Sequence, residues 1–434
     1  MAALVDAKST SARHQSLLHF VGKAPWSDDA VMEAAFEHAI RPMVGHGPIS
    51  AWLVDDTGHR KQGTKSVGVS RQYCGQSGKV ENCQVAVTLS LANETASLPV
   101  GYRLYLPEAW ANDSDRRMAA GVPDDVSFQP KWQIALGLID KALSAGRPRA
   151  PVGADAGYGN VFDFRAGLTE RGLLYIVGIE SNTSVWPPGH EPPPPPPYSG
   201  RGRPPARPRR DDEHHPVSVL ELARSLGTED YTEVTWREGT KGDQRSRFAA
   251  VRVRPSHRDD RRDPHPEEWL LIEWPAGEEK PTKYWLSTLS AELAIAELVF
   301  QAKLRWRIER DFLELKDELG LDHYEGRGWR GFHHHASLCI ATYAFLVAER
   351  ALFSPLSPRG GEGIVKMPAL PRGYRPRGAS PHPAPSADVH RHDQDSHRPG
   401  AAPRPRNVPG LSPAELGTKS AGEDSAASQA FMTQ

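Results

Sequence analysis

The chain has 434 residues, of which 38% are hydrophobic and 25% are charged, and its formal net charge is −1. Such a length and composition predict a globular protein with two or three domains, and the near-neutral charge restricts any nucleic-acid surface to local clusters of basic residues. The three cysteines have neither zinc-ligand nor disulfide spacing, and no leader or run of eighteen apolar residues is present, so we expect a cytoplasmic protein without a membrane span.

The first part of the chain predicts a helix followed by an antiparallel meander. Residues 28–43 have the spacing of a capped amphipathic helix. Residues 51–57, 83–91 and 98–106 have the apolar and β-branched character of strands, and the first is expected to end at its two aspartates. Residues 107–128 are predicted to be an exposed excursion from this sheet.

The next stretch alternates between helical and strand patterns. Residues 131–145 predict a helix, 150–159 a short strand that opens into a glycine-rich turn, 160–171 a helix, and 173–179 an apolar strand. Strands that alternate with helices after a meander indicate a mixed α/β sheet with helices on its faces.

The pattern changes at residues 187–216, which contain six consecutive prolines and a run of arginines. This composition predicts an extended arm. We interpret Arg201, Arg203 and Arg207 as phosphate contacts, with a solvated linker as the alternative. Beyond the arm lie three alternating segments that predict a β-rich insertion: 231–237, 246–254 and 268–274.

Residues 304–327 have the apolar spacing of a helix, with Gly320 as the expected stop. Arg305, Glu309 and Lys316 share one face beside the apolar stripe, at steps of four and seven. Alone, this row is typical of a solvated helical pair, and only the acidic residues of other segments favour a functional site. A second helix is predicted over residues 333–353, and the Pro/Arg/His-rich composition from residue 354 onward predicts a disordered tail.

Three carboxylates lie where separate segments of one α/β core are expected to bring them together. Asp56 is predicted at the end of the first strand, Asp155 at the end of a later strand, and Glu309 on a helix across the sheet. Each has a structural alternative, since Asp155 before Ala-Gly-Tyr-Gly is equally suited to begin a turn. As a set they have the hard oxygen ligands that two Mg²⁺ ions require for phosphoryl transfer.

These segments resemble bacterial insertion-sequence transposases of the DDE type. Arg305, Glu309 and Lys316 match a Tyr-x2-Arg-x3-Glu-x6-Lys signature, in which Ala302 replaces the tyrosine. The segments VDDTG and GADAGYG match the regions of the first and second acids. The threonine that follows makes Asp56 the preferred first acid over Asp55. Similar blocks include SVGVSRQYCG and GLDHYEGRGWRGFHHHA, and the resemblance covers about residues 14–353.

The resemblance implies an RNase H-like mixed sheet flanked by helices, with a β-rich insertion between the second Asp and the catalytic Glu. The expected divisions are an N-terminal helical segment (1–50), the two parts of the core (51–180 and 289–353), the arm and insertion (181–288) and a disordered C-terminal tail (354–434). Asp56, Asp155 and Glu309 would be both the catalytic and the metal-binding residues, and they would hold two Mg²⁺ or Mn²⁺ ions.

The implied activity is that of a transposase, which cuts the inverted terminal repeats of its element and joins them to target DNA. Arg305 and Lys316 would contact the DNA, and a tryptophan of the insertion would stack on a flipped base, for which Trp285 is our choice over a role in core packing. We expect a homodimer on DNA and a nucleoid-associated location. The alternative is a decayed or repurposed transposase that only binds DNA.

Overall fold

The computed structural model describes residues 9–353, except 76, 206–207, 209, 212–213, 238–241 and 259–263. The predicted tail (354–434) and Arg207 therefore lie outside the described residues. The described residues belong to one unit of the chain, Met1–Gly363.

The antiparallel meander predicted for the start of the sheet is confirmed. Strand β1 (Ala51–Arg60) pairs with β3 (Lys79–Ala92), from Ala51 opposite Ala92 to Arg60 opposite Cys83, and β3 pairs in turn with β4 (Ser97–Leu104). Strand β2 (Ser70–Cys74) adds to the far end of β3. Strand β1 is longer than expected and continues past its two aspartates, because Thr57, Gly58 and His59 are still buried and paired with β3.

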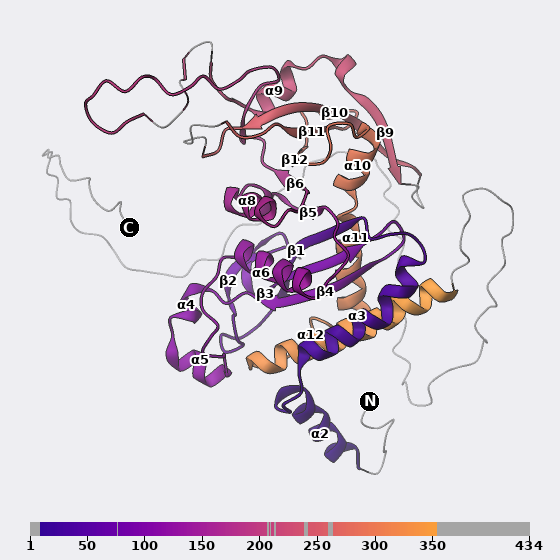
Figure 1. Ribbon diagram of the computed structural model, residues 1–434. Coiled ribbons are helices and arrows are strands. Elements are labelled where there is room, and N and C mark those ends of the chain that lie inside the picture. Colours follow the sequence, from indigo (N-terminus) through magenta and orange to yellow (C-terminus); the bar gives the residue numbers. More distant parts are fainter. Residues whose placement is uncertain are drawn as a thin grey trace, which may run out of the picture. The chain divides into compact units, whose positions relative to one another are not determined.

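Two parallel strands complete the core sheet. Strand β5 (Val152–Ala154) lies parallel to β1, and β6 (Tyr175–Ile179) lies parallel to β5. Helix α6 (Lys131–Ser144) leads into β5, and α8 (Phe162–Glu170) leads into β6 (Figure 1). The short helix α7 (Ala156–Gly159) lies between β5 and α8 in the chain. The order β4-β3-β1-β5-β6 is a mixed sheet of the RNase H-like kind, so the predicted fold class is confirmed.

The β-rich insertion extends this sheet and does not form a separate one. Strand β12 pairs antiparallel with β6, and β11 and β10 follow, so that the described residues form one twelve-stranded sheet. The insertion comprises these elements: β7 (Ser184–Trp186), β8 (Val217–Ser218), α9 (Val219–Ser225), the 3₁₀ turn Thr228–Asp230, β9 (Thr232–Arg237), β10 (Gln244–Pro255), β11 (Glu268–Trp274) and β12 (Lys283–Ser287).

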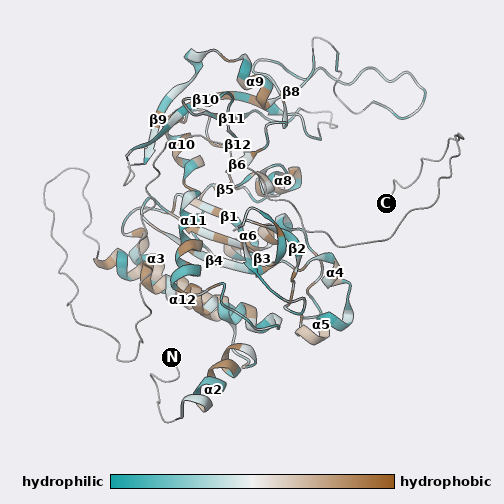
Figure 2. Cartoon of the chain, turned by 180° about the vertical axis from the view of Figure 1, so that it is seen from behind, coloured by the Kyte–Doolittle hydropathy of each residue, from teal (hydrophilic) through white to brown (hydrophobic). Residues whose placement is uncertain are grey.

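Two long helices, near the two ends of the described chain, pack against strand β4. The predicted helix at 28–43 is α3 (Asp28–Val44), whose first turn is capped by the Ser27 hydroxyl, which accepts a bond from the Ala30 amide. Helix α3 packs against α12 (Trp329–Phe353) and is preceded by α2 (Thr10–Gly22). Figure 2 shows apolar residues among hydrophilic ones on α3 and α12.

Helix α12 is, within the described part of the chain, the one helix long and apolar enough to cross a membrane by length and composition. It contacts α3 and β4, and 44% of its most apolar window is buried inside the protein. Its apolar character is therefore accounted for, at least in part, by packing within the unit.

The segment 107–128, expected to be exposed, buries a few apolar residues in a small cluster shared with other parts of the chain. It forms α4 (Glu108–Ala111) and α5 (Ser114–Ala120), and Trp110 and Val122 are buried against Val67 and Phe332. The indole of Trp110 donates to the Val69 carbonyl at 2.8 Å. The few apolar residues that make these contacts have no regular spacing, which is why the sequence pattern missed them.

Candidate active site

Strand β1 directs alternate side chains to opposite faces of the sheet. Leu53 packs with Leu304 and Ile308, near the start of the helix that carries Glu309, whereas Trp52 and Val54 pack in the larger core that includes helix α6. By this alternation Asp55 lies on the same face as Leu53, and Asp56 lies on the same face as Trp52 and Val54. The two adjacent aspartates therefore point in different directions, which the sequence alone did not resolve.

Asp155 lies beside Asp55. It follows directly after β5, whose Ala154 is in register with Val54, and its carboxylate caps α7 by accepting the Gly157 amide at 3.0 Å. Burial raises the pKa of Asp55 to about 7, against the lowering effect of Arg305, and the nearby charges of Asp155 and Asp56 add to the rise. The two strands thus bring Asp155 close enough to raise the pKa of Asp55.

The predicted helix over residues 304–327 is shorter and has a break before Glu309. Helix α10 (Ile295–Lys303) ends first, and α11 (Trp306–Leu313) begins after Leu304 and Arg305. A π-helical turn (Glu314–Glu318) follows, and Gly320 with φ +71° is the stop that the sequence predicted.

The Arg305 side chain contacts acidic residues of both β1 and α11. One guanidinium nitrogen donates to Asp55 at 2.5 Å and another to Glu309 at 2.9 Å. The side chain of Asp55 is 14% exposed, whereas that of Glu309 is 63% exposed. Arg305 is therefore the residue through which Glu309 is connected to the buried strand.

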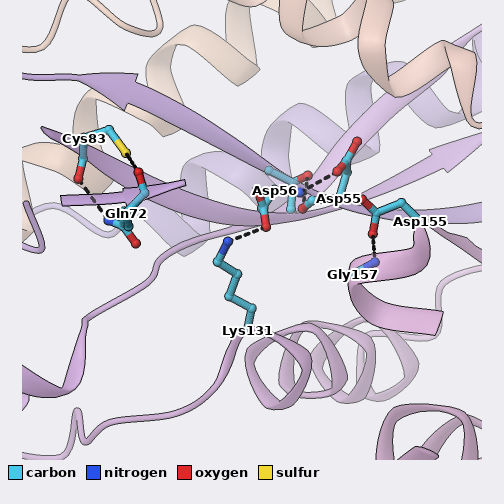
Figure 3. A network of polar contacts seen from close by, with 8 residues as sticks. Asp55, Asp56, Gln72, Cys83, Lys131, Asp155 and Gly157 are labelled. Atoms are coloured by element: carbon cyan, nitrogen blue, oxygen red, sulfur yellow. Dashed lines mark hydrogen bonds and ion pairs between the residues drawn. The ribbon is translucent and has the colours of Figure 1, made fainter. Parts of the chain in front are cut away.

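Asp56, the expected first acid, has another partner. Its carboxylate accepts from the ammonium of Lys131 at 2.7 Å, at the first turn of α6 (Figure 3). Asp55 is thus the member of the pair that shares Arg305 with Glu309, whereas Asp56 pairs with Lys131. The choice of Asp56 as the first acid stays a prediction.

Lys316, the last residue of the predicted row, is buried. Its ammonium donates to the Gly58 carbonyl of β1 at 2.9 Å, and its position in the π-helical turn directs it there. Burial lowers the pKa of Lys316, although the charges of Asp322 and Asp317 oppose this. Lys316 thus connects the end of the helix to the central strand.

Helix α11 is anchored on its other side by Asp311. One oxygen of this buried carboxyl accepts the hydroxyls of Ser97 at 2.5 Å and of Tyr343 at 2.7 Å. These contacts connect α11 to β4 and α12. Burial raises the pKa of Asp311 to about 6, although both hydroxyls favour the ionised form.

The acids and cations described above line one pocket of about 730 Å³. Its charged lining consists of five carboxylates (Asp55, Asp56, Asp155, Glu309 and Asp317) and three cations (Lys131, Arg305 and Lys316). An excess of carboxylates with one raised pKa is the donor set that a hard divalent cation suits. Within the described residues no three acidic or histidine side chains are arranged as a ready metal cage. Arg305 and Lys131 instead pair with the acids.

A second pocket of about 540 Å³ shares Asp155, Arg305 and Glu309 with the first. It contains Trp306, which the sequence analysis overlooked although it directly follows Arg305. The Arg237 guanidinium lies 4.0 Å from the centre of the Trp306 ring. Trp285 also lines this pocket but is only 7% exposed and packs in the core beside Lys303. Base stacking by Trp285 stays a prediction.

The predicted phosphate contacts of the arm lie apart from this site. Arg201 and Arg203 are exposed, and neither lines the two pockets. They stay predictions.

Comparisons with known proteins identify the family of the chain. The family described as DDE superfamily endonuclease matches residues 1–243, more than half of the chain. The chain therefore belongs to the DDE superfamily of endonucleases.

A relative with a more specific description is a probable transposase for insertion sequence element IS701 from Microchaete diplosiphon. It is 34% identical over 172 residues, which are 39% of this chain and 42% of the relative. The chain thus matches about two fifths of the length of that relative.

Proposed function

We propose that the protein is a DNA transposase, which cuts the ends of its insertion sequence and joins them to target DNA. The reactions would be metal-dependent hydrolysis and transesterification of phosphodiester bonds. The observation that carries the proposal is the single pocket into which β1, β5 and α11 bring Asp55, Asp155 and Glu309. Membership of the DDE endonuclease family and the similarity to a transposase support it.

Asp155, Glu309 and the first aspartate would hold the metal, which we propose to be two Mg²⁺ or Mn²⁺ ions. We assign the first position to Asp55, since it shares Arg305 with Glu309, and keep Asp56 as the alternative. Bound ions would activate the attacking oxygen and offset the charge on the phosphate. The side chains fit this role by their chemistry, because all three are carboxylates in a pocket with excess negative charge.

The cations of the pocket would position the DNA. Arg305 presents a planar fork that now contacts two carboxylates, and the same fork suits a phosphate. We propose that Arg305 and Lys316 contact the backbone near the bond that is cut. Lys131 takes the equivalent place beside Asp56 on the other face of β1.

The second pocket offers a path for the strand beyond the acids. Its lining combines Trp236 and Trp306 with Arg237 and Lys283, an arrangement of aromatic and cationic groups typical of single-strand binding. Trp285 at its inner wall and the exposed Arg201 and Arg203 of the arm are further proposed DNA contacts. The protein would act as a homodimer on DNA in the cytoplasm, associated with the nucleoid.

The decisive experiment incubates the full chain with a duplex of the terminal sequence that flanks its coding region, with Mg²⁺ or Mn²⁺. Cleavage at the end of the repeat, with loss of cutting but not of binding in Asp155→Asn and Glu309→Gln, is the expected result. Binding without cutting by the unaltered protein would instead identify the alternative, a repurposed DNA-binding protein. No binding and no cutting would reject both.

A further inference from the structure

A third polar pocket lies beyond the carboxyl end of β6, next to the candidate active site. Its volume is about 540 Å³, and it is formed by the turns after α7 and β6 and by the segment that follows β10. Residues that matter for its chemistry are Asn160, Arg165, Asn182, Thr183 and Arg258. We call it the Asn160 pocket.

The Asn160 pocket and the acidic pocket are linked by one short element. Helix α7 has Asp155 as its N-cap and Asn160 as its C-cap. Four helical residues rise by about 6 Å, so the two pockets lie within a few nucleotides of one another along a DNA strand. Both also lie at the same edge of the sheet, where the parallel strands β5 and β6 end.

The hydrogen bonds of Asn160 define the character of the pocket. Its side-chain oxygen accepts the Glu180 amide at 2.9 Å and the Thr183 hydroxyl at 3.3 Å. With the oxygen occupied in this way, the amide nitrogen remains as a donor, and it has no hydrogen-bond partner among the residues that the structure describes. The pocket therefore offers a fixed N–H donor to an acceptor from outside.

Arginine side chains contribute much of the polar lining of the pocket. Guanidinium groups come from Arg165, Arg210 and Arg258, and the carboxylate of Glu180 also lines it. Arg165 is buried at 4% exposure and donates to the Gly159 carbonyl, while Arg258 at the rim pairs with Asp163. Guanidinium groups beside the amide donor of Asn160 suit a phosphate group.

The backbone of Arg258 is unusual. Its φ of +54° is the one positive value for a non-glycine residue in the described part of the chain. This conformation is unfavourable for a residue with a Cβ, and such residues are concentrated at sites that clamp ligands. The Arg258 guanidinium also lies 5.5 Å from the centre of the Phe162 ring, and the Arg165 guanidinium lies 5.9 Å from it.

We propose that the Asn160 pocket binds a backbone phosphate of duplex DNA a few nucleotides from the bond that is cut. This inference rests on the proposed function, because it assumes that the acidic pocket acts on DNA. The contact would fix the position of the duplex without reading its sequence. Arg258 and the Asn160 amide would be positioning groups and would take no part in the chemistry.

The test measures the affinity of the full chain for labelled duplex DNA over a range of salt concentrations. Arg258→Gln is expected to weaken binding by roughly three- to tenfold and to lower the salt slope by about one, since one phosphate contact is lost. The DNA concentration that gives half-maximal cleavage is expected to rise by the same factor. The matched control is Arg171→Gln, which also removes an arginine paired with an aspartate, Asp140, but at the opposite edge of the sheet.

A scan of single methylphosphonates, which neutralise one phosphate at a time, would locate the contact. One substitution should weaken binding by the unaltered protein and have no effect on the Arg258→Gln protein. Equal affinity and salt slope for Arg258→Gln and the unaltered protein would overturn the inference. So would a loss of poly-glutamate binding in Arg258→Gln without loss of DNA binding, because the surface would then serve an acidic protein.

The outcomes for this pocket and for the proposed function are separable. If the protein binds DNA through Arg258 but cuts none, the pocket stands and the transposase activity fails. If Glu309→Gln abolishes cutting while Arg258→Gln changes nothing, the activity stands and the pocket fails.

Discussion

Arg305 contacts Asp55 at 2.5 Å, although the two residues come from a helix start and a central strand that are 250 positions apart. The guanidinium therefore supplies the positive charge that a buried carboxylate requires in the DNA-free protein. This contact separates Asp55 from Asp56, which pairs with Lys131. It leads directly to the first prediction.

Asp55→Asn is expected to reduce DNA cleavage by more than about 100-fold, as the loss of a metal ligand should exceed the effect of a residue that only supports one. Asp56→Asn is expected to reduce it by less than about tenfold. Single-turnover cleavage of the terminal duplex measures both, with gel-shift binding as the control for folding. The reverse order would return the first position to Asp56.

Mg²⁺ is expected to raise the melting temperature of the DNA-free protein. At ten times the dissociation constant, a bound ion stabilises the folded state by about 1.4 kcal/mol. Glu309→Gln and Asp155→Asn should abolish the shift, whereas Asp29→Asn, which removes an exposed carboxylate paired with Lys141, should keep it. A shift of the same size in all four proteins would place the ion elsewhere.

Lys316→Met is expected to destabilise the DNA-free protein by roughly 1–3 kcal/mol, because the Gly58 carbonyl loses its donor. Urea denaturation measures this, and Lys141→Met is the control, since Lys141 is 60% exposed and its ion pair contributes little. If Lys316 also moves to a phosphate when DNA binds, the salt slope of DNA binding by Lys316→Met should be lower by about one than that of the unaltered protein. Unchanged stability would show that the contact with Gly58 contributes nothing.

Asp311→Asn is expected to change how stability depends on pH. The pKa of Asp311 is about 6 in the folded protein and 3.8 in its ordinary state, so the fold favours the protonated acid. Its stabilisation is present below about pH 4 and is lost as pH rises through 6, by roughly 3 kcal/mol. The free energy of unfolding of the unaltered protein minus that of Asp311→Asn should therefore fall between pH 4 and 7. A flat difference would contradict the raised pKa.

Much of the fold was predictable because its strands and helices have regular apolar spacing. The meander, the strand before Asp155 and helix α3 followed from that spacing alone. The segment 107–128 did not, because its buried contacts come from a few irregularly spaced residues such as Trp110. The continuation of the core sheet through β12 also depends on pairing between distant strands, which periodicity does not encode.

The candidate site was predictable in its residue types and less so in its geometry. The spacing of Arg305 and Glu309 correctly indicated a contact between them. The choice between Asp55 and Asp56 depends on which face of β1 each occupies, and that required the position of α11. Lys131 had no local signal, because its role arises only where α6 meets the central strand.

The late position of α11 in the chain has a consequence for folding during synthesis. Arg305 and Glu309 follow the break between α10 and α11, whereas Asp55 and Asp155 are made much earlier. A nascent chain that has not yet released α11 from the ribosome has Asp55 without the guanidinium that pairs with it in the complete fold. A chain whose synthesis stops before α11 would therefore have the two aspartates of the sheet but neither Arg305 nor Glu309, the third of the proposed metal ligands.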